Sequence, residues 1–399
     1  MLNMMRNVER RGPVRALAIV TLLLLAAPSQ AGVIRVPEDH VDLQDAIDAA
    51  SAGDVIAITG GTHYGVTVDK PLTLVGSASQ KPSIEHGFFS PGSTSLTPCI
   101  RLSTEGVVTL ANLTLHTGFN SSSSVFPPPA VSGSCDELRI LHCAISSTNP
   151  TGDGYQAPAN GMWADCERML FVDSSALGCE MYFNLGVSQI ASVENAGSGL
   201  STSGQLTVLD SVLTGADGPF ATVHGTNWQC GQPGGSSGSG ALAASLAHAN
   251  STFTSGVAGA ASVNYAAPWS DQPDEVCDLP VAAPIVAQSV MEWDASTLAL
   301  SSGGFVADQT TTVTVGALGN ALLLVGPPDV TAPQVGIAGA LYLDADQLSI
   351  TPINAPSQVT RDITPGAFDP EQWGSLVGLQ LYSPGTGLTR PVFMAVLPP

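Results

Sequence analysis

Basic residues are scarce in this chain: Lys and Arg total 12 against 33 Asp and Glu, for a net charge of −21. Four of the basic residues and one acidic residue lie within the first 31 positions, so the remainder carries a net charge of −24. A surface so short of positive charge repels polyphosphates and anionic lipids. We therefore expect no nucleic-acid partner, and we expect polyanionic polysaccharides to bind only where a cation intervenes.

Long apolar runs are equally scarce, and the one that stands out lies in residues 1–31. There, arginines precede the run ALAIVTLLLLAA, and small residues follow at Ser29–Ala31. This order is typical of a secretion signal, and the run is too short to predict a membrane span. We expect the remaining chain, which has no further run long enough to cross a bilayer, to be a monomer that is secreted or held at the cell surface.

The spacings that mark a metal site are absent as well. The seven cysteines lack the closely spaced pairs of a zinc or iron–sulfur site, and export permits them to form disulfides instead. The segment Asp344–Asp346 has the Asp-x-Asp spacing of a calcium loop without the rest of that loop, so it predicts a turn. We expect no cofactor, with calcium as the one cation left open.

What the sequence has instead is an eight-residue motif that returns five times. Each copy begins with an apolar residue, carries Asn, His or Asp at its fifth position, and ends on an apolar or small residue. The copies begin at Val108, Leu138, Met169, Leu206 and Leu246. Repetition of a strand-length unit at a roughly fixed period predicts stacked coils of β-strands, that is, a β-solenoid.

The fifth residue of each copy predicts a corner in the backbone. Asn and Asp tolerate left-handed backbone and form Asx turns, which suits a one-residue bend between two strands. Stacked on successive coils, the five residues are expected to form a structural ladder of Asn112, His142, Asp173, Asp210 and Asn250. A row of carboxylates that serves catalysis or calcium binding is the alternative interpretation.

A further strand precedes each motif, so each coil is predicted to hold three strands. The first inward-facing residue of that strand is apolar, and the five are Ile100, Val131, Met162, Leu200 and Leu242. The intervals between motifs exceed the length of a bare coil, which predicts protruding loops. These loops are rich in Ser, Gly and Pro and span residues 116–129, 147–160, 180–197 and 217–239.

The segment after the signal predicts a cap and a first coil. Apolar residues recur at helical spacing over residues 41–52, and strands are expected at Val55–Ile58, Gly65–Val68 and Leu72–Val75. A helix laid over the open end of a solenoid hides its first unpaired strand edge.

Residues 34–76 resemble the opening of right-handed parallel β-helix proteins of the pectin-lyase-like superfamily. The resemblance rests on an extended Val-Pro segment, a Gln-x-Ala-Ile helix, a Gly-Asp turn and a coil that ends near Gly; the residues are Val36, Pro37, Gln44, Asp45, Ala46, Ile47, Gly53, Asp54, Leu74 and Gly76. It implies an all-β fold in which residues 32–280 form a right-handed parallel β-helix with an N-terminal capping helix. Enzymes and non-enzymes share this fold, so the chemistry stays open.

The motif is lost after about residue 280, where strands alternate with Gly and Pro turns. Residues 281–399 resemble the C-terminal β-sandwich modules of secreted bacterial proteins, on the segments Gly339–Asp344, Trp373–Tyr382 and Leu388–Val396. The resemblance implies a small β-sandwich domain that serves attachment, carbohydrate contact or capping of the last coil.

In enzymes of this fold, the outer face of the first strand holds the sugar chain. Period-2 alternation places Arg101, Trp163 and Asp165 on that face, among several serines. A hydrolase needs two facing carboxylates, and this face holds one. The calcium-binding acids of pectate lyases and the tandem aspartates of polygalacturonases are also missing from it. Elsewhere, His116, His142 and His224 share no pattern with an acid and a nucleophile.

Trp163, Arg101 and Asp165 therefore form the candidate ligand surface. An exposed Trp ring stacks on a sugar, while Arg and Asp hold its hydroxyls; a loop packed over Trp163 is the alternative. We interpret the chain as a non-catalytic secreted protein that serves extracellular adhesion or binds a polysaccharide or cell-surface glycan. The alternative is a polysaccharide-active enzyme, a lyase or glycoside hydrolase, whose catalytic residues come from the loops.

Cys135 and Cys166 each lie three residues before their motif, which places them in one column on adjacent coils, facing inward. Neighbouring strands lie ~4.8 Å apart, within the range of Cα separations that disulfides accept. We therefore expect a Cys135–Cys166 disulfide, with two stacked thiols as the alternative. Cys230 and Cys277 are a second candidate pair.

Overall fold

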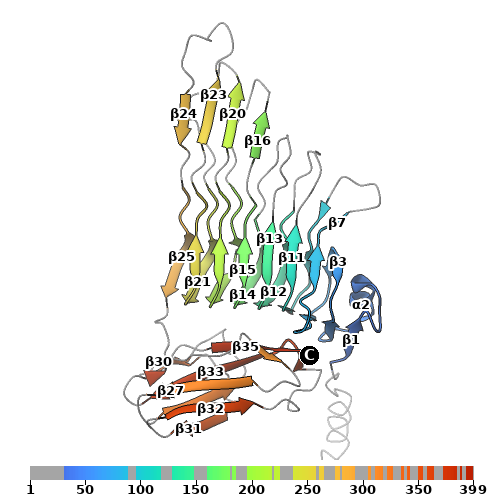
Figure 1. The fold of residues 1–399 in the computed structure, drawn as a ribbon, viewed down its shortest axis with the longest axis vertical. Helices are drawn as coiled ribbons and strands as arrows, with labels where there is room; N and C mark the ends of the chain where they lie inside the picture. Colours follow the sequence, from blue (N-terminus) through green and yellow to red (C-terminus); the bar gives the residue numbers. More distant parts are fainter. Residues whose placement is uncertain are drawn as a thin grey trace, which may run out of the picture. The chain divides into compact units, whose positions relative to one another are not determined.

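The computed structural model describes residues 31–88, 96–117, 128–147, 160–179, 182–185, 196–217, 220–224, 237–257, 260–264, 275–278, 281–292, 304–306, 311–317, 321–326, 334–336, 339–341, 349–353, 357–363, 372–383, 387–388 and 392–398. Gly32–Pro399 is one compact unit. Strands in mostly parallel sheets make up this unit, and α2 is the one α-helix in its described part (Figure 1). The all-β class that the sequence predicts is therefore confirmed.

The largest sheet has 12 strands, and its neighbouring strands run parallel. Each repeat of the sequence motif adds strands to it in register, so that Val131 lies opposite both Ile100 and Met162. The strands are β1 (Val33–Val36), β2 (Val55–Ile58), β4 (Val66–Val68), β5 (Thr73–Gly76), β9 (Ile100–Ser103), β10 (Val107–Ala111), β12 (Val131–Leu141), β14 (Met162–Val172), β17 (Leu200–Ser201), β18 (Gln205–Leu209), β21 (Ala241–Ala249) and β25 (Ile285–Glu292).

Two features of this sheet differ from the sequence-based expectation. In β12, β14 and β21 the first and second predicted strands are one continuous strand. In addition, β25 lies beyond residue 280, where the motif is lost, and pairs in parallel with β21. The parallel sheet therefore extends one strand beyond the fifth motif.

A second, seven-stranded sheet takes the third strand of each repeat. A corner residue separates it from the first sheet: β10 ends at Ala111, Asn112 has a φ of 53°, and β11 begins at Thr114. All of the pairings in this sheet are parallel. Its strands are β3 (Thr62–Tyr64), β6 (Ser83–Glu85), β11 (Thr114–Thr117), β13 (Ala144–Ser147), β15 (Ser175–Leu177), β19 (Val212–Thr214) and β22 (Thr252–Thr254).

A further sheet of four strands takes its first two strands from segments that were expected to be loops, and the other two from the chain after the fifth motif. Three of them pair in parallel, and the fourth runs antiparallel (Figure 1). They are β16 (Tyr182–Leu185), β20 (Phe220–His224), β23 (Ala260–Asn264) and β24 (Glu275–Asp278). A short hairpin of β7 (Gly87–Phe88) and β8 (Leu96–Thr97) precedes the first motif. The Ser, Gly and Pro content of these segments concealed the short alternating stretches that pair here.

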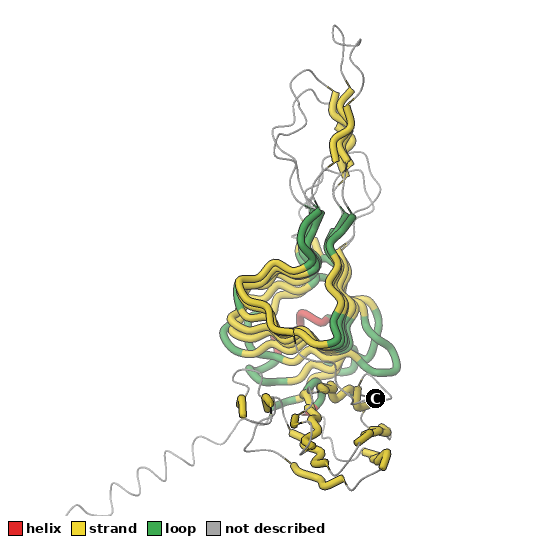
Figure 2. Tube along the Cα trace, turned by 90° about the vertical axis from the view of Figure 1, so that its left-hand side faces the viewer, coloured by secondary structure: helices red, strands yellow, loops and turns green. Residues whose placement is uncertain are grey.

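The core lies inside the ring of strands that Figure 2 shows nearly end-on. Inward positions of successive repeats stack there, as Ile100, Val131, Met162 and Leu200 do from the first strands. Phe171 is fully buried among them. Full burial of such a side chain contributes about 1.5–3 kcal/mol, so the repeating apolar columns are the main source of stability.

The helix α2 (Leu43–Ala49) begins at Asp42, whose carboxylate accepts a hydrogen bond from the Gln44 backbone N–H. It is shorter than the predicted 41–52 because the backbone is extended again at Ala50. Its buried side chains join the core, and these are Leu43, Ala46 and Ile47.

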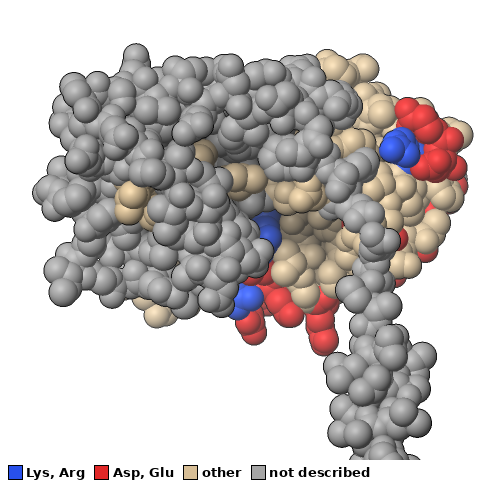
Figure 3. Space-filling view, turned by 90° about the horizontal axis from the view of Figure 1, so that it is seen from below, with Lys and Arg blue, Asp and Glu red and all other residues tan. Residues whose placement is uncertain are grey.

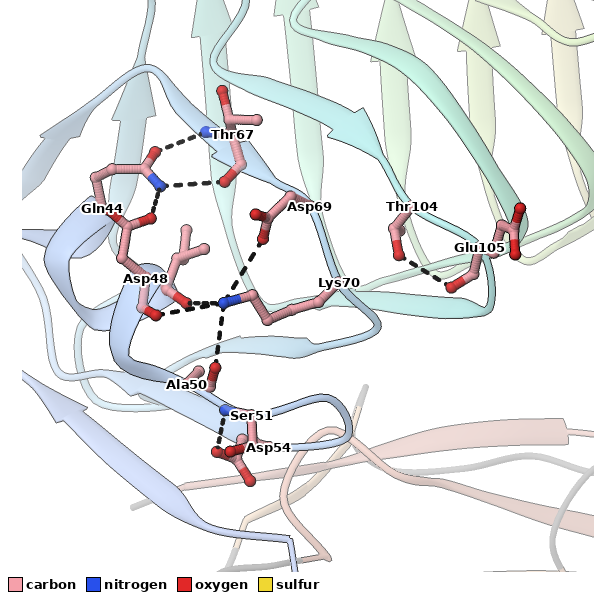
Figure 4. A network of polar contacts seen from close by, with 11 residues as sticks. Gln44, Asp48, Ala50, Ser51, Asp54, Thr67, Asp69, Lys70, Thr104 and Glu105 are labelled. Atoms are coloured by element: carbon pink, nitrogen blue, oxygen red, sulfur yellow. Dashed lines mark hydrogen bonds and ion pairs between the residues drawn. The ribbon is translucent and has the colours of Figure 1, made fainter.

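Two side chains fix this helix to the first repeat (Figure 4). The Gln44 amide exchanges two hydrogen bonds with the Thr67 backbone, of 2.8 and 3.2 Å. The Lys70 ammonium donates to three carbonyls at the C-terminal end of the helix, those of Ile47, Asp48 and Ala50. A cation at that end also stabilises the helix dipole.

The C-terminal part holds a six-stranded sheet, which is mostly antiparallel, and two strand pairs. The six strands are β26 (Gly304–Val306), β28 (Ala321–Gly326), β31 (Ser349–Ile353), β33 (Leu376–Ser383), β34 (Gly387–Leu388) and β35 (Val392–Leu397). The two pairs are β27 (Thr311–Ala317) with β32 (Ser357–Ile363) and β29 (Gln334–Gly336) with β30 (Gly339–Leu341). Asp344–Asp346 lies outside the described residues.

Side chains of the C-terminal strands pack on the outward face of the large sheet. Leu324 and Leu397 belong to one apolar cluster with Leu141, Leu170 and other outward residues of successive repeats. The Ala78 N–H donates to the Pro398 carbonyl at 3.0 Å. These outward positions are apolar because they are covered, which the alternation of the motif alone does not reveal.

Candidate functional site

The three residues of the candidate ligand surface come from the first strands of neighbouring repeats. Strand register places Arg101, Ser132 and Trp163 side by side on β9, β12 and β14. Asp165 lies two residues after Trp163 and opposite Ser134. At ~4.8 Å per strand, Arg101 and Trp163 are about 10 Å apart along one column of the outward face.

Trp163 is the prominent side chain of this face, because 55% of it is exposed. Its neighbours in the column are Ser132 and Ser201, both small. Serine side chains are too short to cover an indole ring, which agrees with the exposure of Trp163. Such a ring can stack on a flat apolar surface, including the face of a sugar.

Two charged residues of the face lie near the ring: Arg101 two strands away, and Asp165 on the same strand as Trp163. Arg101 and Asp165 are both exposed. The Asp165 carboxylate accepts a hydrogen bond from the Ser203 hydroxyl, which links two neighbouring repeats. The face therefore offers guanidinium donors, carboxylate acceptors and serine hydroxyls around an aromatic ring.

The strand register corrects one position on this face. Leu242 was expected to face inward, but Leu200 pairs with Ala241, and it is Ala241 that is buried. Leu242 lies opposite Ser201, in the outward column of Trp163. The expected register was wrong by one residue, because the adjacent residues Ala241 and Leu242 are both apolar and either could face inward.

The five corner residues all have positive φ, between 45° and 53°. Each follows a residue of one register column, which runs through Ala111, Leu141, Val172, Leu209 and Ala249. The backbone N–H of one corner donates to the next repeat, as from Asn112 to the Leu141 carbonyl at 2.9 Å.

The corner side chains also form hydrogen bonds from one repeat to the next. His142 Nδ1 lies 2.8 Å from Asp173 Oδ2, and the Asn250 amide donates to Asp210 Oδ1 at 2.7 Å. The buried Asn112 amide donates to the Ser77 carbonyl at 2.7 Å. Among the described residues, no group of three His, Cys, Asp or Glu is arranged to hold a metal ion.

Cys135 and Cys166 lie opposite each other on β12 and β14, both buried. Their sulfurs are 2.9 Å apart and both residues are free thiols in the structure, so the expected disulfide is not shown. In-register parallel strands project the two side chains in the same direction instead of toward each other. The hydrogen bond to Cys166, together with burial, raises the pKa of the Cys135 thiol. Cys230 lies outside the described residues, and Cys277 lies on β24 opposite Ala261.

One buried charge escaped the sequence analysis. The Glu137 carboxylate is 4% exposed and accepts hydrogen bonds from Arg139 at 2.6 Å and from Arg168 at 3.1 Å. Arg168 lies opposite Glu137 on the next strand, so the ion pair joins two repeats. The signal was a carboxylate and a guanidinium directly before two neighbouring motif copies, at Glu137 and Arg168, with a second guanidinium at the second motif position, Arg139.

Acidic side chains dominate the charged surface of the face in Figure 3, where they gather along its right-hand and lower edges.

No helix in the described part of the chain has the length and apolar character needed to span a membrane. No protein-family model matches the chain, and no curated protein matches it either.

Proposed function

We propose that the repeats form a right-handed parallel β-helix of the pectin-lyase-like kind, with α2 as its N-terminal cap. In both large sheets the strands of each repeat pair in parallel with those of the next repeat, which supports this architecture. The buried residues of α2 support its role as a cap. Sheet pairings from residue 304 onward support a C-terminal β-sandwich domain.

We further propose that the protein is exported through the signal at residues 1–31 and serves extracellular adhesion by binding a neutral glycan. The observation that carries this proposal is Trp163, 55% exposed and set between serines on a rigid sheet. A stacking ring with donors and acceptors around it suits a sugar, which has one apolar face and many hydroxyls.

The charge of the chain argues for an uncharged ligand. The chain after residue 31 carries a net charge of −24, and Asp165 adds a carboxylate to the face itself. A polyanionic sugar chain would be repelled there unless calcium bridged it. The proposed ligand is thus a neutral polysaccharide or cell-surface glycan.

A depletion assay with insoluble and soluble neutral polysaccharides tests this proposal. Protein starting at Gly32 is expected to bind, and Trp163→Ala is expected to lose at least tenfold in affinity, since stacking is the main contact. Tyr64→Ala is the matched control, because Tyr64 is an exposed aromatic residue on the other sheet. Equal binding by the wild-type protein and Trp163→Ala would exclude this face.

The same samples also test the alternative of a polysaccharide-active enzyme. Release of reducing ends or of unsaturated sugars from a bound polysaccharide would favour a hydrolase or a lyase. Binding without release supports the adhesion role. Repeating both assays with and without calcium decides whether a cation contributes.

A further inference from the structure

A column of chemically reactive side chains lies on the seven-stranded sheet, away from Trp163. Strand register places Glu85, His116 and Ser146 directly side by side on β6, β11 and β13. In Figure 1, β11 and β13 are neighbours in this sheet. The sequence analysis missed the set because its members are about 30 residues apart, one on each repeat.

All three side chains face outward. Their neighbours Ile84, Leu115 and Ile145 are buried in the core, and side chains alternate between the two faces of a strand. Glu85, His116 and Ser146 are each partly exposed. They are thus accessible to solvent but held by strands that are paired on both sides.

The central contact is a hydrogen bond between a hydroxyl and an imidazole. His116 Nδ1 lies 2.9 Å from Ser146 Oγ. This is the distance at which an imidazole can accept the proton of a serine nucleophile. Because both residues lie on paired strands, the contact is built into the sheet.

Glu85 lies on the opposite side of His116, one strand away. At ~4.8 Å between strands, a glutamate side chain is long enough to reach the ring from that side. The neighbouring His86 responds to both groups: burial lowers its pKa, the Glu85 carboxylate raises it, and the His116 ring lowers it. Carboxylate and imidazole therefore lie close enough to influence the same group.

We propose that Ser146, His116 and Glu85 form an ester-hydrolysing site, with Ser146 as nucleophile, His116 as general base and Glu85 as the residue that positions the imidazole. Ser146 Oγ attacks the ester carbonyl carbon and gives its proton to His116 Nδ1. The carbon–oxygen bond to the alcohol breaks, and the departing oxygen takes that proton. Water then attacks the acyl-serine and releases the acid, and its second proton restores the Ser146 hydroxyl.

The surroundings favour an uncharged ester with an apolar acyl group. Leu177 lies next to Ser146 on β15 and is 40% exposed, which offers an apolar contact for the acyl chain. The acidic chain and Glu85 itself disfavour an anionic ester. This site is on a different sheet from Trp163, so it does not depend on glycan binding.

Two probes test the nucleophile: a fluorophosphonate, which labels activated serines, and 4-nitrophenyl acetate. In protein starting at Gly32, we expect the label on the peptide that contains Ser146 and its loss in Ser146→Ala. Hydrolysis of the acetate should fall at least 100-fold in Ser146→Ala and in His116→Asn. Ser175→Ala and His142→Asn are matched controls from the same stack and should hydrolyse at the wild-type rate.

Absence of label on Ser146 in the wild-type protein would overturn the proposal, as would hydrolysis that His142→Asn lowers as much as His116→Asn does. For Glu85, the informative readout is the division between kcat and KM. Glu85→Gln should lower kcat about tenfold or more with KM unchanged, and Glu85→Asp should recover part of the loss. An unchanged kcat in Glu85→Gln would remove Glu85 from the site.

Discussion

His142 Nδ1 and Asp173 Oδ2 lie 2.8 Å apart on the corners of two successive repeats. Both residues also have left-handed backbone, with φ of 52° and 45°. The corner column thus combines a conformation that most residues avoid with side-chain bonds that run from one repeat to the next. Both constraints favour Asn, Asp and His, polar side chains that are found more often than others in left-handed backbone.

This combination predicts the effect of substitutions at Asp173. In Asp173→Val, a β-branched side chain must adopt positive φ and the bond to His142 is lost, so the free energy of unfolding should fall by about 1–3 kcal/mol. Asp173→Asn tolerates the conformation and should lose less than about 1 kcal/mol. Urea unfolding measures both, with Ser175→Val on an exposed strand position as control. Equal losses in the Val and Asn variants would contradict the role of the backbone.

The apolar columns inside the repeats predict a larger effect. Phe171 has no exposed surface and contacts the core of several repeats. Phe171→Ala should therefore lower the free energy of unfolding by about 3–5 kcal/mol, from lost burial and the cavity that remains. Leu177→Ala, at a position that is 40% exposed, should cost far less. Thermal unfolding of the two variants makes the comparison, and similar melting temperatures would refute it.

Local chemistry allowed the sequence to predict much of the repeat geometry. Asn112 and Asp173 predict a bend because short polar side chains suit left-handed backbone, and each has positive φ. The strand expected at Val55–Ile58 is β2. Both features depend on residues close together in the chain, which a sequence pattern records.

Features that depend on contacts between repeats were harder to predict. Leu242 was assigned to the wrong face because only its pairing with Ser201 fixes the register. Leu141 and Leu170 face outward and are apolar because side chains from the C-terminal strands pack on them. The hydrogen bond between His116 and Ser146 joins residues 30 positions apart. No local pattern carries this information.

The buried thiols predict how stability depends on pH. Burial raises the pKa of Cys99 to about 12 and that of Cys143 to about 11, from ordinary values of 9.0. A thiol with a raised pKa in the folded state stabilises the fold below its unfolded pKa. That contribution is lost as pH rises toward the folded pKa, because the unfolded chain loses its proton first. We expect the free energy of unfolding to fall between pH 9 and 12.

The double variant Cys99→Ala, Cys143→Ala isolates this effect. Urea unfolding at pH 8, 9.5 and 10.5 should give a shallower decline in the variant than in the wild-type protein. At pH 8 both thiols should resist iodoacetamide until the protein unfolds, since the thiolate is the reactive form. Rapid alkylation of native Cys99 or Cys143 would show that they are not buried thiols.

The contact between the C-terminal strands and the large sheet predicts the effect of a charge placed within it. Leu170 is 1% exposed and belongs to the apolar cluster that includes Leu324 and Leu397. A lysine there must either remain buried without a partner or displace its cover, and an unpaired buried charge is the costlier outcome. Leu170→Lys should therefore loosen the C-terminal strands while the repeats, whose own core is separate, stay folded.

Hydrogen exchange should accelerate at least tenfold in Leu376–Ser383 and Val392–Leu397 but not in β12. Val212→Lys, at an exposed position of β19, should leave all three segments unchanged. Unaltered exchange in Leu170→Lys would mean that the C-terminal strands do not rely on this face.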